Sequence, residues 1–133
     1  HGPRGGDEVN VIQPGGNYGW PILSFGINYS GTSFAEGTYR EGMEPPVTYW
    51  DPSIAPSGMT FVTSDIYPEW KGHLLVGSLK FAHIQLLTLN GENVMDKTEL
   101  LPGIGRVRSL KQGPDGFIYV GTTGGGIYRI VPS

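Results

Sequence analysis

Short hydrophobic runs alternate with glycine- and proline-containing segments along the whole of this 133-residue chain. The runs are rich in Val, Ile, Leu, Phe and Tyr, and their lengths are typical of β-strands. No window shows helical periodicity over three turns. The pattern therefore predicts an all-β chain with strands at residues 9–12, 47–50, 59–63, 73–78, 84–89, 107–111, 117–122 and 127–131.

Turn residues between the runs predict hairpins. Asn90-Gly91 is a type I′ turn signal between the run at 84–89 and a further extended stretch at 93–101. Residues 113–116 are Gly-Pro-Asp-Gly, which favours a tight turn before the next run. The three glycines at 124–126 precede no helix, so they indicate a hairpin turn and not a phosphate loop.

Two segments near the end of the chain resemble each other. Residues 74–78 are Leu-Leu-Val-Gly-Ser and residues 118–122 are Ile-Tyr-Val-Gly-Thr, and a further hydrophobic run follows each. Val76 and Val120 are 44 residues apart. A period of about 40–50 residues with four short strands in each unit is typical of a β-propeller blade. A β-sandwich in which the similarity is coincidental is the alternative.

The number of blades follows from the chain length. At this period the 133 residues form about three blades, whereas a closed propeller has about four to eight. We therefore expect residues 1–133 to form one segment of a propeller, without an internal domain boundary. The remaining blades would be supplied from elsewhere.

Composition excludes several classes of protein. The 22 glycines and 11 prolines approach the range of disordered chains, but 38% hydrophobic, 11% aromatic and only 16% charged residues indicate a folded one. A net charge of −3 without a basic run argues against nucleic-acid binding. The absence of cysteine excludes disulfides and thiolate metal sites. No apolar run approaches the length of a membrane span, and no signal-peptide core is present at the start of the chain.

The first ten residues combine three glycines, a proline and two carboxylates. Backbone carbonyls and carboxylate oxygens are the ligands that Ca²⁺ prefers. The alternative is an acidic loop without a metal. Tyr18, in the aromatic segment 17–21, is expected in a core turn, although its backbone carbonyl could also reach a metal.

Three cations form a second group of interest. Lys80 follows the strand predicted at 73–78, and Arg106 and Arg108 lie at the start of the strand predicted at 107–111. Strand alternation puts the two arginines on one face, opposite Val107. They are either solvated edge charges that oppose aggregation, or an anion site for carboxylates or phosphates. Spacing alone leaves both open.

The three histidines, His1, His73 and His83, are scattered along the chain. None has a partner at metal-ligand or catalytic spacing. We expect each to have a surface or packing role.

Taken in order, the motifs of the chain resemble the C-terminal part of soluble PQQ-dependent aldose sugar dehydrogenases, the glucose/sorbosone dehydrogenase family. The resemblance runs nearly end to end. It is carried by residues 1–10, 16–21, 26–31, 56–59, 76–80, 106–108 and 113–116. The family fold is a six-bladed β-propeller, so the resemblance implies that this chain covers roughly the last two to three blades.

The resemblance also implies a site for pyrroloquinoline quinone (PQQ). Lys80, Arg106 and Arg108 match cationic contacts of the family to this cofactor, and Tyr29 matches a further contact. The cofactor is a planar quinone with three carboxylates, so the paired positive charge suits it.

Two calcium sites follow from the same resemblance. Gly2 and Pro3 match backbone-carbonyl ligands of the Ca²⁺ that polarises the quinone. Glu8 and Tyr18 match ligands of a second, structural Ca²⁺.

The activity that the resemblance implies is oxidation of aldoses at C1 to lactones, with hydride transfer to the quinone. A histidine acts as base in the family, and it lies upstream of the motif at 1–10; none of the three histidines here matches it. We therefore expect the isolated chain to be inactive. The alternative function is a non-catalytic propeller segment that serves as a structural or binding module.

The implied partners are an aldose substrate and the upstream blades, from the same protein or from a companion chain. A homodimer remains open. The family resemblance implies a periplasmic or secreted location.

Overall fold

The computed structural model describes residues 5–19, 37, 41, 43–50 and 53–132. Over these residues it contains nine β-strands and no helix, as the hydrophobic pattern predicts. The chain divides into two compact units, His1–Ala55 and Pro56–Ser133, and each is described by itself. That residues 1–133 belong to a single propeller domain without an internal boundary stays a prediction. Within the described ranges, no helix is long and apolar enough to cross a membrane.

The first unit contains one pair of antiparallel strands, β1 (Asp7–Val9) and β2 (Thr48–Trp50), with Glu8 opposite Tyr49. The strand predicted at 47–50 is confirmed. The strand predicted at 9–12 is wrong, because pairing ends at Val9 and the chain beyond it has no partner in β2. Ile12 is accordingly 75% exposed.

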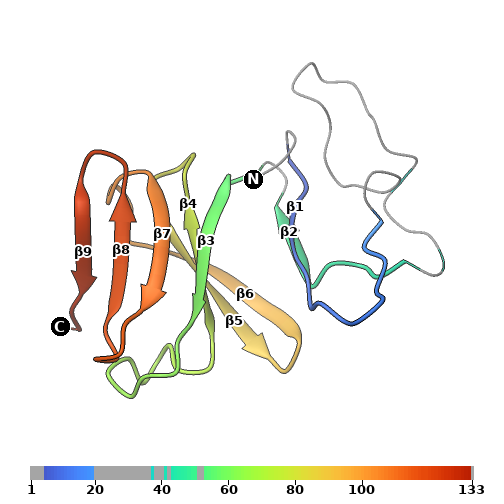
Figure 1. Ribbon diagram of the computed structural model, residues 1–133, viewed down its shortest axis with the longest axis horizontal. Helices are drawn as coiled ribbons and strands as arrows, with labels where there is room; N and C mark the ends of the chain where they lie inside the picture. Colours follow the sequence, from blue (N-terminus) through green and yellow to red (C-terminus); the bar gives the residue numbers. More distant parts are fainter. Residues whose placement is uncertain (1–4, 20–36, 38–40, 42, 51–52, 133) are drawn as a thin grey trace. The chain divides into compact units, whose positions relative to one another are not determined.

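The second unit begins with a four-stranded antiparallel sheet (Figure 1). Its strands follow in chain order as β3 (Pro56–Phe61), β4 (Leu74–Ser78), β5 (Ile84–Asn90) and β6 (Asn93–Leu100). All four predicted strands are confirmed, with ends shifted by up to three residues.

The hairpin between β5 and β6 is confirmed, but its predicted turn type is wrong. Asn90 pairs with Asn93, so the loop consists of Gly91 and Glu92. Only Gly91 has a positive φ, 62°. A type I′ turn needs a positive φ at both central residues, whereas a glycine at the first position alone suits type II′.

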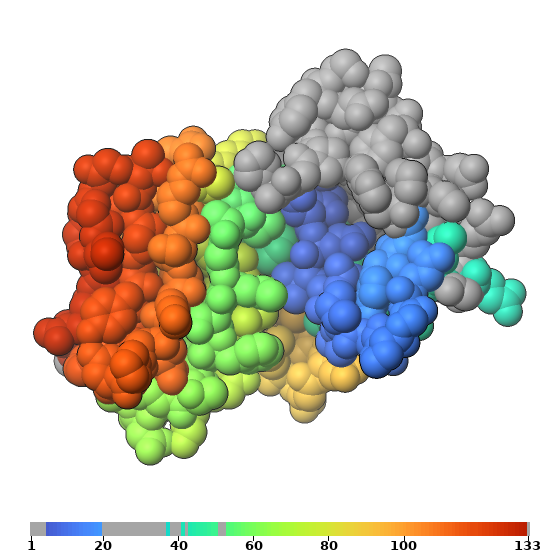
Figure 2. All heavy atoms as spheres, in the orientation of Figure 1, coloured from blue at the N-terminus to red at the C-terminus, as the bar shows by residue number. Residues whose placement is uncertain are grey.

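The second sheet has three antiparallel strands, β7 (Val107–Gln112), β8 (Ile118–Thr122) and β9 (Gly126–Ile130). In Figure 2 these strands lie side by side, in orange to red, next to β3 in green. The tight turn at 113–116 is confirmed, since the amide of Gly116 donates to the carbonyl of Gly113 at 3.0 Å. The hairpin predicted at 124–126 is confirmed with its turn at 123–125, since Gly126 already pairs with Thr122 as the first residue of β9.

The same irregularity occurs in the first strand of both sheets. One extra residue bulges out of β3 opposite β4, and one bulges out of β7 opposite β8. The extra residue is Ser57 in β3 and Arg108 in β7. The repeat seen in the sequence therefore corresponds to a repeated antiparallel meander with a bulge at the same place.

The hydrophobic core lies between the two sheets and is formed by both. Glycines allow the close approach: a Cβ at Gly58 would lie 3.3 Å from the amide nitrogen of Leu110, and one at Gly77 would overlap the side chain of Val107. The buried cluster consists of Val62, Tyr67, Leu75, Ile84, Leu86, Val107, Leu110, Ile118 and Val120.

Candidate functional site

The three predicted cations lie at one end of the second unit. Lys80 is in the loop that follows β4, Arg106 precedes β7, and Arg108 is in β7. The hydroxyl oxygen of Ser57 lies 2.5 Å from the carbonyl oxygen of Val107 and 3.3 Å from that of Gly77. One side chain therefore bridges the end of β4 and the start of β7, which are adjacent (Figure 1).

The two arginines are exposed on either side of Val107, which is fully buried. This exposure is consistent with the strand alternation expected from the sequence. That both arginines lie on one face stays a prediction, because Arg108 is the extra, unpaired residue of a bulge, where the regular ladder is interrupted. Thr123 fixes both residues: its amide donates to the carbonyl of Arg106 at 3.0 Å, and its hydroxyl accepts from Nε of Arg108 at 2.9 Å.

Lys80 is exposed, and its Nζ lies 5.1 Å from the centre of the Phe81 ring. The loop that carries it is tied to the segment that leads into β7. The amide of Gly103 donates to the carbonyl of Ala82 at 3.1 Å. Because Arg106 follows Gly103 by three residues, this hydrogen bond links the backbone segments that present Lys80 and Arg106.

No carboxylate forms an ion pair with these three cations among the described residues. The ion pairs found there are Lys71 with Asp65, at 2.5 Å, and His83 with Glu99, at 3.6 Å. An exposed group of cations without an acidic partner can accept an anion. Arginine forks bind carboxylates in a bidentate manner, while lysine acts as a point charge.

The first unit brings together oxygen atoms around Glu8. The side-chain amide of Asn10 donates to Oε2 of Glu8 at 3.4 Å. Burial raises the pKa of the Glu8 carboxyl, the hydrogen bond from Asn10 lowers it, and the charge of Asp7 raises it further. The Oδ1 atom of Asn10 is buried without a hydrogen-bond partner in the described part of the chain. A buried polar atom without a partner is rare, and an amide oxygen beside a carboxylate suits a hard cation.

Tyr18 closes a turn, as expected, but the turn does not belong to the hydrophobic core, because Tyr18 is only half-buried. Its hydroxyl accepts from the amide of Gln13 at 2.6 Å and donates to the carbonyl of Val11 at 3.0 Å. The hydroxyl is therefore engaged, and any contact of Tyr18 with a metal would come from its backbone.

Three predicted site residues, Gly2, Pro3 and Tyr29, lie outside the described residues. Over the part of the chain that is described, no group of three or more His, Cys, Asp or Glu side chains could hold a metal ion. A calcium site here would therefore depend on backbone carbonyl and amide oxygens in addition to Glu8.

Two of the three histidines have packing roles, as predicted. Nδ1 of His73 accepts from the amide of Leu89 at 3.0 Å. His83 is only 5% exposed and lies beside Gln85 and Glu99. His1 lies outside the described residues.

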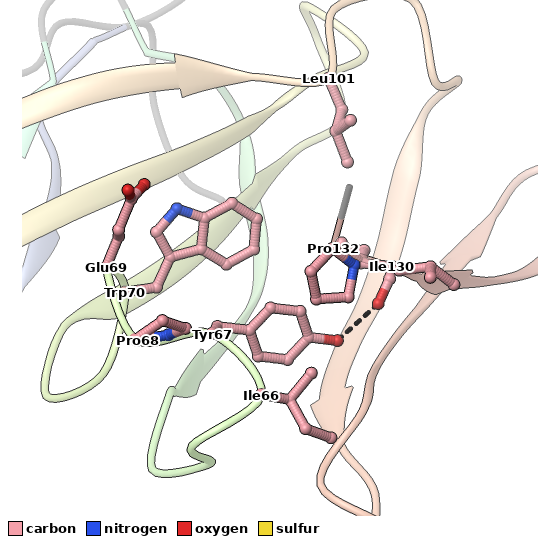
Figure 3. Close-up of a pocket in the computed structure, with 9 residues that line it drawn as sticks. Ile66, Tyr67, Pro68, Glu69, Trp70, Leu101, Ile130 and Pro132 are labelled. Carbon is pink, nitrogen blue, oxygen red and sulfur yellow. Dashed lines mark hydrogen bonds between the residues drawn. The ribbon is translucent and has the colours of Figure 1, made fainter.

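None of the three cations lines a pocket of about 450 Å³ in the second unit. The pocket is lined by the loop after β3, by Leu101 just after β6, and by the end of β9 with the residues beyond it. Figure 3 shows the ring of Tyr67 beside that of Trp70, with centroids 5.2 Å apart, and the Tyr67 hydroxyl directed at the carbonyl of Ile130. No local motif indicates this pocket, because Tyr67 contacts residues 51 and 63 positions away.

Sequence reasoning missed three residues that shape the candidate sites: Asn10, Ser57 and Thr123. Each acts through a hydrogen bond or an unpaired atom that depends on the fold. Ser57 occupies the place in β3 that Arg108 occupies in β7, since both are the extra residue of their bulge, and a bulge is recognised only from the pairing with the partner strand.

Repeated antiparallel meanders with a bulge in the first strand of each are the arrangement expected of successive β-propeller blades. Comparison with known proteins identifies the chain further. The chain belongs to the Glucose / Sorbosone dehydrogenase family, whose model matches residues 1–129.

Similar proteins support this assignment. The chain is 44% identical to the aldose sugar dehydrogenase YliI of Escherichia coli (strain K12), over 99% of this chain and 37% of that protein. A crystal structure of a glucose dehydrogenase is 40% identical with a TM-score of 0.94, over 100% of this chain and 40% of that one. A PQQ-bound aldose sugar dehydrogenase from Streptomyces coelicolor is 25% identical with a TM-score of 0.61, over 90% of this chain and 32% of that one.

These similarities confirm the propeller prediction and exclude the β-sandwich alternative. The chain spans well under half the length of the relatives it matches. It therefore covers part of the family fold.

Proposed function

We propose that this chain is part of a PQQ- and calcium-dependent dehydrogenase that oxidises aldoses at C1 to lactones, with hydride transfer to the quinone. The observation that carries the proposal is the group formed by Lys80, Arg106 and Arg108. They come from two segments, the loop after β4 and the start of β7, lie at one end of the second unit, and form no ion pair with a described carboxylate. Three carboxylates on a planar ligand are complementary to such a group.

In this proposal the chain binds and orients the cofactor. Arg106 and Arg108 hold carboxylates of PQQ, Lys80 adds a point charge, and Tyr29 contributes by its position in the family motif. PQQ, when bound, supplies the electron acceptor that protein side chains lack.

The calcium part of the proposal is supported by residues of the first unit. Gly2 and Pro3 would offer backbone carbonyls to the cofactor-site ion, by family position. For the second ion, the buried Oδ1 of Asn10 without a partner and the adjacent carboxylate of Glu8 support a cation that completes their contacts. Tyr18 would join them through its backbone.

The remaining blades and the histidine base would come from the rest of the same protein or from a companion chain. Exposed apolar side chains at the last strand support packing against a further blade: on β9, Ile127 is 78% exposed, and Val131 just beyond it is 62% exposed. An aldose is the substrate, and the periplasm is the location that the family resemblance favours. The 133-residue chain alone should show no PQQ-dependent oxidation of glucose with a dye acceptor.

The cofactor site is tested by titrating the complete apo-dehydrogenase with PQQ in the presence of Ca²⁺. Arg106→Ala and Arg108→Ala should each weaken PQQ binding by about tenfold or more, because each removes a charge-assisted hydrogen bond. Lys111→Ala is the matched control, since Lys111 is an exposed cation of the same strand, β7. Equal PQQ affinity in both arginine variants and the wild type would exclude the anion site.

The calcium site is tested by thermal unfolding with Ca²⁺ and with a chelator. Calcium should raise the melting temperature of the wild type, and this rise should shrink in Glu8→Gln and in Asn10→Ala. Glu92→Gln, in the exposed hairpin loop, is the control. An undiminished rise in both variants would exclude this pair from the site.

A further inference from the structure

The Lys80 side chain contacts an aromatic ring in its own loop. Its Nζ lies 5.1 Å from the ring centre of Phe81, which is 45% exposed. A lysine ammonium within about 6 Å of an aromatic centre is attracted by the negative face of the ring. Such contact holds a long side chain that would otherwise sample many rotamers.

The ring of Phe81 is itself supported from within the fold. It stacks with the ring of His83, with centroids 6.0 Å apart and planes at 14°. His83 is nearly buried, and its two ring nitrogens lie 3.6 Å from Oε1 of Glu99 and 3.3 Å from Nε2 of Gln85. The histidine therefore offers Phe81 a fixed surface.

The backbone of the loop is fixed as well. The amide of Phe81 donates to the hydroxyl of Ser78 at 3.0 Å, and the amide of Ser78 donates to the carbonyl of His83 at 2.9 Å. Ala82 adopts a φ of 54°, which a residue with a Cβ keeps only where its surroundings hold it there. Its carbonyl accepts the hydrogen bond from Gly103.

We propose that Phe81, supported by His83, is a positioning residue that holds the Lys80 ammonium ready for the anionic cofactor. The inference rests on the proposed function, in which Lys80 contacts PQQ. The ring orders the lysine before binding, so less side-chain entropy is lost when the carboxylate arrives. Phe81 acts through Lys80 and makes no contribution of its own to the cofactor.

Phe81→Leu is the variant that tests the proposal, because leucine retains apolar bulk and removes the aromatic face. The complete apo-dehydrogenase is titrated with PQQ and the dissociation constant is measured directly. We expect Phe81→Leu to weaken binding about two- to fivefold. Phe81→Tyr keeps the aromatic face and should restore wild-type affinity.

The chain offers a matched control. Arg129 lies 4.7 Å from the ring centre of Phe117, so this second cation–aromatic pair has the same chemistry at the other end of the second sheet. Phe117→Leu should leave PQQ affinity unchanged. An equal loss of affinity in Phe81→Leu and Phe117→Leu would overturn the proposal.

A double-mutant cycle with Lys80→Ala separates positioning from direct contact. If Phe81 acts through the lysine, Phe81→Leu has no further effect on the dissociation constant in the Lys80→Ala background. A loss that persists there, or tighter binding by Phe81→Leu alone, overturns the positioning role. If Lys80→Ala itself leaves PQQ affinity unchanged, the assignment of Lys80 to the cofactor site fails instead.

Discussion

The hydroxyl of Ser57 and the carbonyl oxygen of Val107 lie 2.5 Å apart, although the two residues are 50 positions apart in the sequence. The bond joins the first strand of one sheet to the first strand of the next. Ser57 can make it because it is the extra residue of a bulge and does not follow the regular ladder of β3. The contact therefore joins the two sheets at the end of the second unit where the cations lie.

Replacement of Ser57 by alanine should destabilise the protein. The change removes the hydrogen bond to Val107 and leaves a carbonyl between the sheets without that donor, which costs about 0.5–1.5 kcal/mol. Urea unfolding measures the loss. Ser109→Ala, an exposed serine of β7 for which the described residues show no side-chain hydrogen bond, should change stability by less than about 0.5 kcal/mol. Equal stability of the Ser57 variant and the wild type would contradict the structural role.

The two repeats predict a difference between equivalent glycines. A Cβ at Gly77 would overlap the side chain of Val107, which is fully buried and cannot move aside. Gly77→Ala should therefore cost about 1–3 kcal/mol, as overpacking of a core does. At Gly121 the Cβ would meet the hydroxyl of Ser109, which can rotate away. Gly121→Ala should cost clearly less, and the reverse order in chemical unfolding would contradict this account.

Much of the second unit could be predicted from the sequence, because within each sheet every strand pairs with the strand next to it in the chain. The run at 74–78 and its repeat at 118–122 showed both the strands and the blade period. The bulges were not predicted, since an extra residue is defined only by the partner strand. Alternation still gave the exposure of Arg106 and Arg108, but not the hydrogen bond to Thr123.

The first unit was harder to predict for a similar reason. Residues 9–12 have the composition of a strand, yet β1 lies at Asp7–Val9 because that is where β2 offers a partner. The unpaired oxygen of Asn10 also follows from burial and cannot be recognised from residue type. The carboxylates of residues 1–10 suggested calcium by their chemistry, but the assignment of Glu8 itself came from the family resemblance.

Tyr67→Phe should destabilise the second unit strongly, although it removes only the hydroxyl group of the side chain. The Tyr67 hydroxyl donates to the carbonyl of Ile130 at 2.6 Å (Figure 3). It also accepts from the amide of Ile118 at 2.9 Å. Ile118 is fully buried, so its amide would lose its partner in a place that water does not reach easily. An unsatisfied buried donor costs about 1–3 kcal/mol.

The control for this variant is Tyr128→Phe, since Tyr128 is 44% exposed on β9. Its hydroxyl has access to water, and we expect a change of less than about 0.5 kcal/mol. Hydrogen exchange adds a local readout: the amide of Ile118 should exchange faster in Tyr67→Phe than in Tyr128→Phe. Unchanged protection of that amide would mean that the hydroxyl does not hold it.

The pair formed by Asp115 and Tyr119 predicts a dependence of stability on pH. The Tyr119 hydroxyl donates to Oδ2 of Asp115 at 2.6 Å. This hydrogen bond is the main reason that the pKa of the Asp115 carboxyl lies below its ordinary value, and the main reason that the pKa of Tyr119 lies above its own. In Tyr119→Phe, the pKa of Asp115 should therefore move up, which NMR titration of its carboxyl measures.

The two pKa shifts determine how the stability of the protein changes with pH. The depressed pKa of Asp115 contributes stability above the ordinary carboxyl value of about 3.9, and this contribution is lost as pH falls through the lower, folded-state pKa. The raised pKa of Tyr119 contributes stability below the ordinary value of about 10, and this contribution is lost as pH rises through the higher, folded-state pKa. The stability difference between wild type and Tyr119→Phe should thus be largest near neutral pH and shrink toward both extremes.

Asp65 is the internal control, because Lys71 lowers its pKa by a separate hydrogen bond, and that pKa should not move in Tyr119→Phe. A stability difference that is independent of pH would show that the variant acts through packing alone.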